Sequence, residues 1–131
     1  MGILNRDQIL AAHAIQRETV AVPEWGGDVL VQEFTGETRD RWEQSMWRSV
    51  EGNPKAPVPN TRARMAAFSV VDEQGAPLFS EADIEALGKK SVAALDRVVA
   101  VADRLNGLSE ESVVALEKNL LPGPSDASIS A

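Results

Sequence analysis

A repeat of apolar residues late in the chain is the feature that most constrains the fold. After Ser91, six apolar side chains recur at helical spacing on one face: Val92, Leu95, Val98, Val99, Ala102 and Leu105. Charged residues lie largely off that face, which is typical of a helix that buries one side. Ser91 can cap the first turn, and Asn106-Gly107 can end the helix in the left-handed conformation. The pattern predicts an amphipathic helix that packs against other elements.

Caps and apolar spacing predict further helices along the chain. We expect a short helix over 6–14, one from Thr35-Gly36 towards Val50, a nearly all-apolar helix over 61–71 capped by Asn60, a short one from Ser80 to Gly88, and a last helix from Ser109. Asn5 followed by Gln8 is a capping-box pattern for the first of these helices. Three prolines in 51–60 each remove an amide donor, so that segment is expected to be a loop.

The period of the apolar residues changes from helical to alternating near the N-terminus. Val20 and Val22 alternate with smaller or polar residues, as do Val29 and Val31. The segment between these runs contains Gly26-Gly27, so the sequence predicts a β-hairpin. The expected fold is α+β and predominantly helical, with this N-terminal β-hairpin packed on a bundle of about five helices.

Length and composition set the domain organisation. A chain of 131 residues with 44% hydrophobic residues can build one core, which we place in a single domain over 1–121. The segment 122–131 has too little apolar surface to offset its conformational entropy, so we expect a disordered tail there.

Charge excludes some classes of partner. Thirteen basic residues stand against 20 acidic ones, giving a formal charge of -7 that would repel a phosphate backbone. The clustered basic residues are Arg62 with Arg64, and Lys89-Lys90. No run approaches the ~20 apolar residues that span a bilayer. We therefore expect no nucleic-acid partner and no membrane partner.

Residues for catalysis or metal binding are sparse. The chain has no cysteine and a single histidine, His13, which rules out cysteine chemistry and histidine pairs. Asp72-Glu73-Gln74-Gly75 lacks the further ligands of a calcium loop and is better explained as a solvated turn. We expect no enzyme activity, no cofactor and no metal, and therefore assign no catalytic, cofactor-binding or metal-binding residue.

Apolar residues that could reach the surface are the candidates for partner binding. Trp42 and Trp47 lie about 140° apart on one predicted helix, at ~100° per residue. Either one packs inward while the other is partly exposed, or both belong to the core. The candidate partner-binding residues are Trp42, Met46, Trp47, Leu78, Phe79, Val113, Leu116 and Leu120.

An ordered series of segments resembles a known family. These segments are 4–10 (LNRDQIL), 22–29 (VPEWGGDV), 70–75 (VVDEQG), 78–80 (LFS) and 104–109 (RLNGLS). Together they are similar to the tail assembly chaperones of long-tailed, siphovirus-type bacteriophages and prophages, over roughly 3–119. The segments contain local structural signals, such as helix starts and turns, and carry no catalytic motif.

The resemblance implies a role in protein interaction. Such chaperones bind and solubilise the tape measure protein and help to recruit tail tube protein subunits during virion morphogenesis. They act in the host cell cytoplasm and are not retained in the mature virion. Self-association into a homo-oligomer is expected as well.

The resemblance also implies a programmed ribosomal frameshift, which produces a longer form of the chain that is a further partner. Glu117-Lys118-Asn119 can be encoded by a slippery run.

The alternative function is a small cytoplasmic adaptor or regulator that binds nucleic acid through Arg62, Arg64, Lys89 and Lys90.

Overall fold

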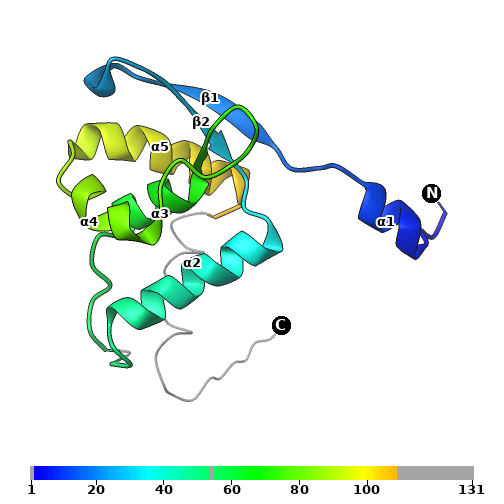
Figure 1. Cartoon of the computed structure of the whole chain (residues 1–131), viewed down its shortest axis with the longest axis horizontal. Coiled ribbons are helices and arrows are strands. Elements are labelled where there is room, and N and C mark those ends of the chain that lie inside the picture. The colour runs from blue at the N-terminus through cyan, green and yellow to red at the C-terminus, as the bar shows by residue number, and fades with distance from the viewer. Residues whose placement is uncertain (1, 54, 109–131) are drawn as a thin grey trace.

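A three-stranded antiparallel sheet lies against helices in this α+β protein (Figure 1). The structure is a computed structural model that describes residues 2–53 and 55–108. Its helices are α1 (Arg6–Ala11), α2 (Gly36–Ser49), α3 (Thr61–Ser69), α4 (Ile84–Leu87) and α5 (Val92–Leu105), with 3-10 turns η1 (Pro23–Trp25) and η2 (Glu81–Asp83). The strands are β1 (Arg17–Val22), β2 (Gly27–Gln32) and β3 (Val70–Val71). The predicted helix-rich α+β class is confirmed.

The predicted β-hairpin is present and forms two of the three strands. β1 and β2 pair antiparallel, with Val20 opposite Val29 and Val22 opposite Gly27. The connection is η1, and Gly26 closes it with φ of 81°, a left-handed conformation that glycine adopts without steric penalty. The hairpin therefore has the glycine turn that the sequence predicts.

The third strand was not predicted. The helix expected over 61–71 ends at Ser69, and Val70 and Val71 pair with Val31 and Leu30 of β2. β-Branched valines lose rotamer freedom in a helix and fit a pleated sheet, and here β2 offers free backbone partners. The apolar composition of 61–71 concealed this change from helix to strand.

α5 covers the inner face of the sheet, as the apolar repeat predicts. Val98, Ala94 and Ala102 of α5 are fully buried, and so are Val22 and Val31 of the hairpin. The Ser91 side chain accepts a hydrogen bond from the Ala94 amide at 3.3 Å, and Gly107 follows the helix with φ of 68°. Both predicted ends of this helix are confirmed.

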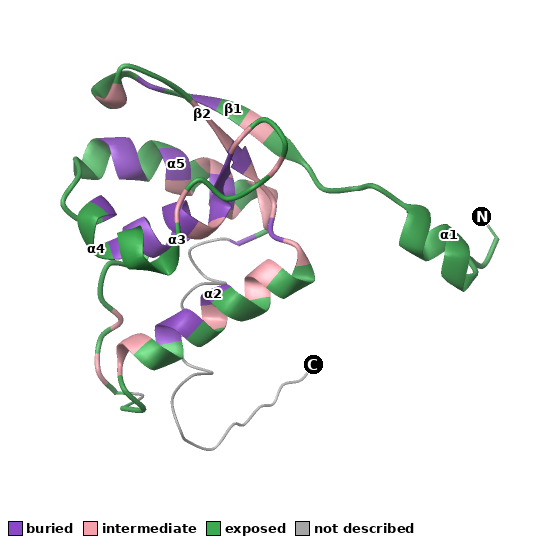
Figure 2. Ribbon diagram, in the orientation of Figure 1, coloured by how far each residue is buried: buried purple, intermediate pink, exposed green. Residues whose placement is uncertain are grey.

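α1 stands apart from the rest of the described chain. Figures 1 and 2 show it projecting from β1, with every residue exposed. The capping box between Asn5 and Gln8 is confirmed. The helix ends at Ala11, although we expected it to reach position 14, because no body surface supports another turn. We call residues 2–16 the arm.

The cap predicted at Asn60 does not form, and the predictions from Ser109 onward fall outside the described residues. Asn60 precedes α3 but makes no capping hydrogen bond, since its backbone is left-handed with φ of 55°. Its side chain lies against Gly88 instead, where an added Cβ would collide with it. The last helix from Ser109, the boundary at 121 and the tail over 122–131 lie outside the described residues.

Candidate partner-binding surfaces

The inner side of α2 fixes Trp42 in the core. Thr35 caps the helix by accepting a hydrogen bond from the Thr38 amide at 3.0 Å. Trp42 is 5% exposed, its ring centroid lies 5.5 Å from that of Phe34, and the Arg39 guanidinium lies 5.5 Å from the indole centroid. Met46, one turn later, is also buried. These two partner-binding candidates belong to the core of the described structure.

The outer side of the same helix presents Trp47 to solvent. Its side chain is 40% exposed, although it is five residues from the buried Trp42. The separation of about 140° around the helix accounts for this difference. The structure matches the alternative in which one tryptophan packs inward and the other is partly exposed.

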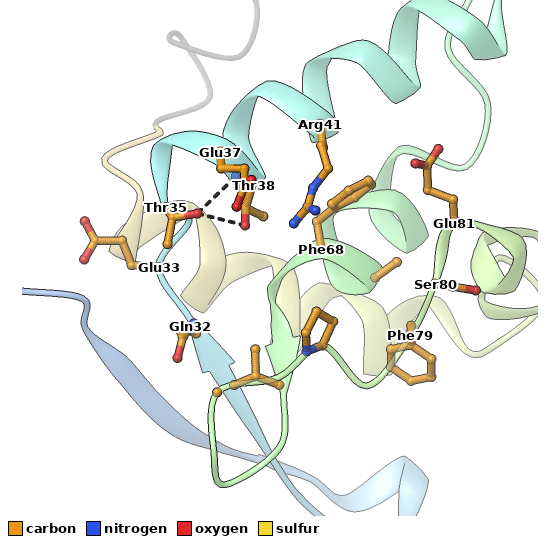
Figure 3. Close-up of a pocket in the computed structure, with 14 residues that line it drawn as sticks. Gln32, Glu33, Thr35, Glu37, Thr38, Arg41, Phe68, Phe79, Ser80 and Glu81 are labelled. Atoms are coloured by element: carbon orange, nitrogen blue, oxygen red, sulfur yellow. Dashed lines mark hydrogen bonds between the residues drawn. The ribbon is translucent and has the colours of Figure 1, made fainter.

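A groove lies between the first half of α2 and the chain that follows α3 (Figure 3). It encloses about 410 Å³. Its lining residues are Gln32, Glu33, Thr35, Glu37, Thr38, Arg41, Ala67, Phe68, Val71, Gly75, Pro77, Phe79, Ser80 and Glu81. Figure 3 shows Arg41 reaching down beside Phe68. The lining thus combines apolar side chains, Phe68 and Phe79 among them, with three carboxylates and one guanidinium.

The remaining partner-binding candidates are Phe79 in this groove, its neighbour Leu78, and three residues that the structure does not describe. Phe79 lines the groove and is half-buried, and the adjacent Leu78 is 53% exposed. Val113, Leu116 and Leu120 lie outside the described residues. The sequence reasoning missed Phe68, because it placed 61–71 in one nearly all-apolar helix, and it also missed Arg41 of α2. The turn residues after Val71 were the available signal that the chain reverses there.

Arg64 is a buried cation between three segments. It is 6% exposed, and its guanidinium donates hydrogen bonds to Ser45 Oγ at 3.1 Å and to the Pro59 carbonyl at 3.1 Å. Its Nε is buried without a hydrogen-bond partner. Burial lowers the pKa of the Arg64 guanidinium, and the charge of Glu81 partly opposes this shift. Arg64 therefore ties α3 to α2 and to the end of the 51–60 loop.

The basic residues do not form the patch that the nucleic-acid alternative requires. Arg64 is buried, and Arg62 is paired with Asp96 at 2.6 Å. Of the four basic residues named for this alternative, only Lys89 and Lys90 are exposed and outside the ion pairs of the described residues. A phosphate backbone would thus meet two lysines on an acidic protein, too few for strong counterion release.

Ion pairs join the hairpin to α5. The Arg97 guanidinium donates to both Glu24 carboxylate oxygens, at 2.9 and 3.1 Å, and Arg104 pairs with Glu18 at 2.6 Å. The hydrogen bonds from Arg97 lower the pKa of Glu24, and those to Glu24 raise the pKa of Arg97. These pairs are exposed, so we expect each to contribute little to stability.

Asp103 provides a pH test of this helix. Burial raises the pKa of its carboxyl above the ordinary value of 3.8. Its contribution to stability is therefore fully present below pH 3.8 and is lost as the pH rises through the raised pKa. We expect Asp103→Asn to raise the free energy of unfolding at pH 7 by up to about 1 kcal/mol. The gain should shrink towards pH 3, which urea titrations at several pH values measure; a constant gain would contradict this account.

The described residues show no assembled centre for chemistry. Among them, no group of three or more His, Cys, Asp or Glu side chains could hold a metal ion. His13 lies on the exposed arm. Within the same ranges, the helices are too short or too polar for one to span a bilayer. What the described surface offers is an apolar groove, an exposed tryptophan and an exposed arm.

These features define a small α+β protein whose described surface is suited to contacts with polypeptides. The model of the phage tail assembly chaperone family matches residues 5–119, so the chain belongs to that family. This membership assigns it a role in tail assembly and indicates a non-enzymatic one.

Comparison with solved structures gives the same fold. The tail assembly chaperone of bacteriophage HK97 matches with a TM-score of 0.52 and 21% sequence identity, covering 79% of this chain and 95% of that chain. At this identity the likeness shows the fold alone. No curated protein matches the chain.

Proposed function

We propose that this chain binds the tape measure protein during tail assembly, keeps that client soluble, and helps to recruit tail tube subunits. Family membership supports the proposal. We also propose that it acts in the host cell cytoplasm, leaves before the virion is finished, and works with a longer frameshifted form of itself.

The exposed Trp47 is the observation that carries client binding. Buried Trp42 and Met46 hold α2 against the core, so Trp47 is presented from a fixed helix. A partly exposed tryptophan on a rigid element is a frequent hot spot, and an apolar stripe of a client helix can pack against it. The net charge of -7 keeps the chaperone itself soluble while it presents this side chain. Val113, Leu116 and Leu120 lie outside the described residues and are kept as further candidates for client binding.

Co-expression tests the proposal. The chain is produced with the tape measure protein of the same gene cluster, and the soluble and co-purified fractions of the client are measured. We expect solubility of the client to depend on the chaperone. Trp47→Ser should lower the co-purified client at least about tenfold, as expected for loss of a hot spot.

Val92→Ser is the matched control, because Val92 is another exposed apolar residue on a different helix. It should leave co-purification unchanged. Circular dichroism and thermal unfolding establish that both variants fold. An insoluble, unbound client beside folded wild-type chaperone would refute the proposed function and return attention to the adaptor alternative.

A further inference from the structure

One wall of the groove is a turn that hydrogen bonds hold in place. The Asp72 carboxylate accepts a hydrogen bond from the Ala76 amide at 2.9 Å. The Arg17 guanidinium, from the start of β1, donates to the Glu73 carbonyl at 3.0 Å. Gly75 of this turn lines the groove with φ of 84°, which fits glycine. The turn therefore keeps its shape without a bound partner.

The opposite wall is the first half of α2, which is anchored at its start. The Phe34 amide donates a hydrogen bond to the Asn106 side chain at 2.8 Å, and Thr35 caps the helix. Two turns further along, Trp42 is buried in the core. Because both walls are fixed, the groove is preformed, and a ligand binds without the cost of opening it.

Apolar side chains within the groove are left partly open to a ligand. Phe68 and Phe79 line it, and both are half-buried. The adjacent Leu78 is 53% exposed. The groove, of about 410 Å³, has room for about two apolar side chains, since ~150 Å³ holds a benzene-sized group. Its size and lining suit the apolar side chains of another polypeptide.

The charge of the lining decides which polypeptides fit. Three carboxylates and one guanidinium leave a formal charge of -2, from Glu33, Glu37, Glu81 and Arg41. Glu81 pairs with Arg48, whereas Glu37 is exposed and outside the ion pairs among the described residues. A purely apolar ligand would remove water from these carboxylates, which costs free energy unless a cation pairs with them. Charge complementarity therefore favours a basic ligand.

We propose that the groove binds a basic amphipathic segment of another polypeptide. Apolar side chains of the segment enter beside Phe68 and Phe79. Lysine or arginine side chains, three or four positions away in the segment, pair with Glu37 and Glu33. Helical spacing brings both kinds of side chain to one face of the segment. The net charge of -7 on the whole chain adds attraction for the same partner.

This site is separate from the exposed tryptophan of the proposed client surface. Glu37 and Trp47 are both on α2, about 15 Å apart along the helix axis at ~1.5 Å per residue. The inference rests on the proposed function in one respect, that the chain binds polypeptides, and it names the chemistry of the segment bound. Substitutions in the groove and at Trp47 can therefore be tested independently.

Fluorescence anisotropy with synthetic peptides and the full chain tests the proposal. A labelled peptide of about 15 residues carries leucine at helical spacing and lysine elsewhere. Two comparison peptides replace lysine by glutamate or leucine by serine. We expect the leucine/lysine peptide to bind at least about tenfold more tightly than either, and to weaken about tenfold between roughly 0.05 and 0.5 M salt.

The peptide comparison has clear contrary outcomes. Absence of binding up to about 1 mM overturns the proposal. Equal binding of the leucine/glutamate peptide overturns the basic requirement, and equal binding of the serine/lysine peptide shows attraction by charge alone, which overturns the groove as the site. The tape measure protein is not used, so these outcomes are distinct from failure of the co-expression test.

Variants of the chain locate the binding site. Glu37→Gln should raise the dissociation constant about threefold, as expected for loss of one exposed ion pair. Asp28→Asn removes the same charge from the end of β2 opposite the groove and should leave it unchanged. Thr38→Phe places a ring in the groove and should raise it at least about tenfold. Circular dichroism establishes that each variant folds. Loss of peptide binding in Trp47→Ser, with none in Thr38→Phe, overturns the proposal.

Cysteine protection gives a second readout, because the chain has no native cysteine. Thr38→Cys and Asp28→Cys are each treated with a maleimide, with and without saturating leucine/lysine peptide. We expect the peptide to slow labelling at Thr38→Cys at least about fivefold and to leave Asp28→Cys within about twofold. Equal labelling rates at Thr38→Cys with and without peptide overturn the assignment of the groove as the site.

Discussion

Replacing Trp42 by alanine is expected to lower the free energy of unfolding by about 3–5 kcal/mol. The indole is 5% exposed and lies against Phe34 and beneath Arg39, so its removal deletes buried apolar area and leaves a cavity. Single domains are stable by only about 5–15 kcal/mol, and the change should lower the melting temperature by roughly 10 °C or more. Urea and thermal unfolding followed by circular dichroism measure both quantities.

Trp47→Ala is the matched comparison for this prediction. The same chemical change five residues further along should cost less than about half as much, because the side chain is already 40% exposed. It should act on client binding instead. Equal losses of stability for the two variants would contradict the division of α2 into a buried and an exposed side.

The second large effect is expected at Arg64. Arg64→Ala should lower the free energy of unfolding by about 2–4 kcal/mol, since it leaves a cavity and removes hydrogen bonds from Ser45 and Pro59. Arg64→Met should cost less than about 1 kcal/mol, because it fills much of the same volume without burying a charge. Denaturant titration of both variants gives the comparison.

The contrast between the two substitutions is the informative quantity. Arg64 has a buried Nε without a partner, and its desolvation lowers the pKa of the guanidinium. Its hydrogen bonds are therefore offset by the penalty for burying the cation. A loss above about 2 kcal/mol for Arg64→Met would show that the hydrogen bonds outweigh that penalty.

Local signals predicted much of the fold because they act over a few residues. The Ser91 cap, the left-handed Gly107 and the glycine turn at Gly26 all appear where the sequence places them. In each case a short motif satisfies orphan backbone groups or supplies a special φ value, independently of the rest of the protein. The hairpin and α5 could be predicted for this reason.

Features that depend on distant parts of the chain could not be predicted in this way. Val70 and Val71 become a strand because β2, about 40 residues earlier, offers free backbone groups. Arg64 is buried because α2 and the 51–60 loop enclose it, and nothing near it in the sequence indicates that environment. The groove arises from four segments, so of the residues that line it only Phe79 was named as a candidate from the sequence.

The ion pairs between the hairpin and α5 also bear on the order of events at the ribosome. The partners Glu18 and Arg104 are 86 positions apart, and the apolar face of β1 and β2 is covered by a helix that ends at Leu105. At about 5–20 residues per second, synthesis from Val22 to Leu105 takes roughly 4–17 s. During that interval the hairpin exposes Val20, Val22 and Val31, so the nascent chain itself passes through a stage at which its strands need protection from aggregation.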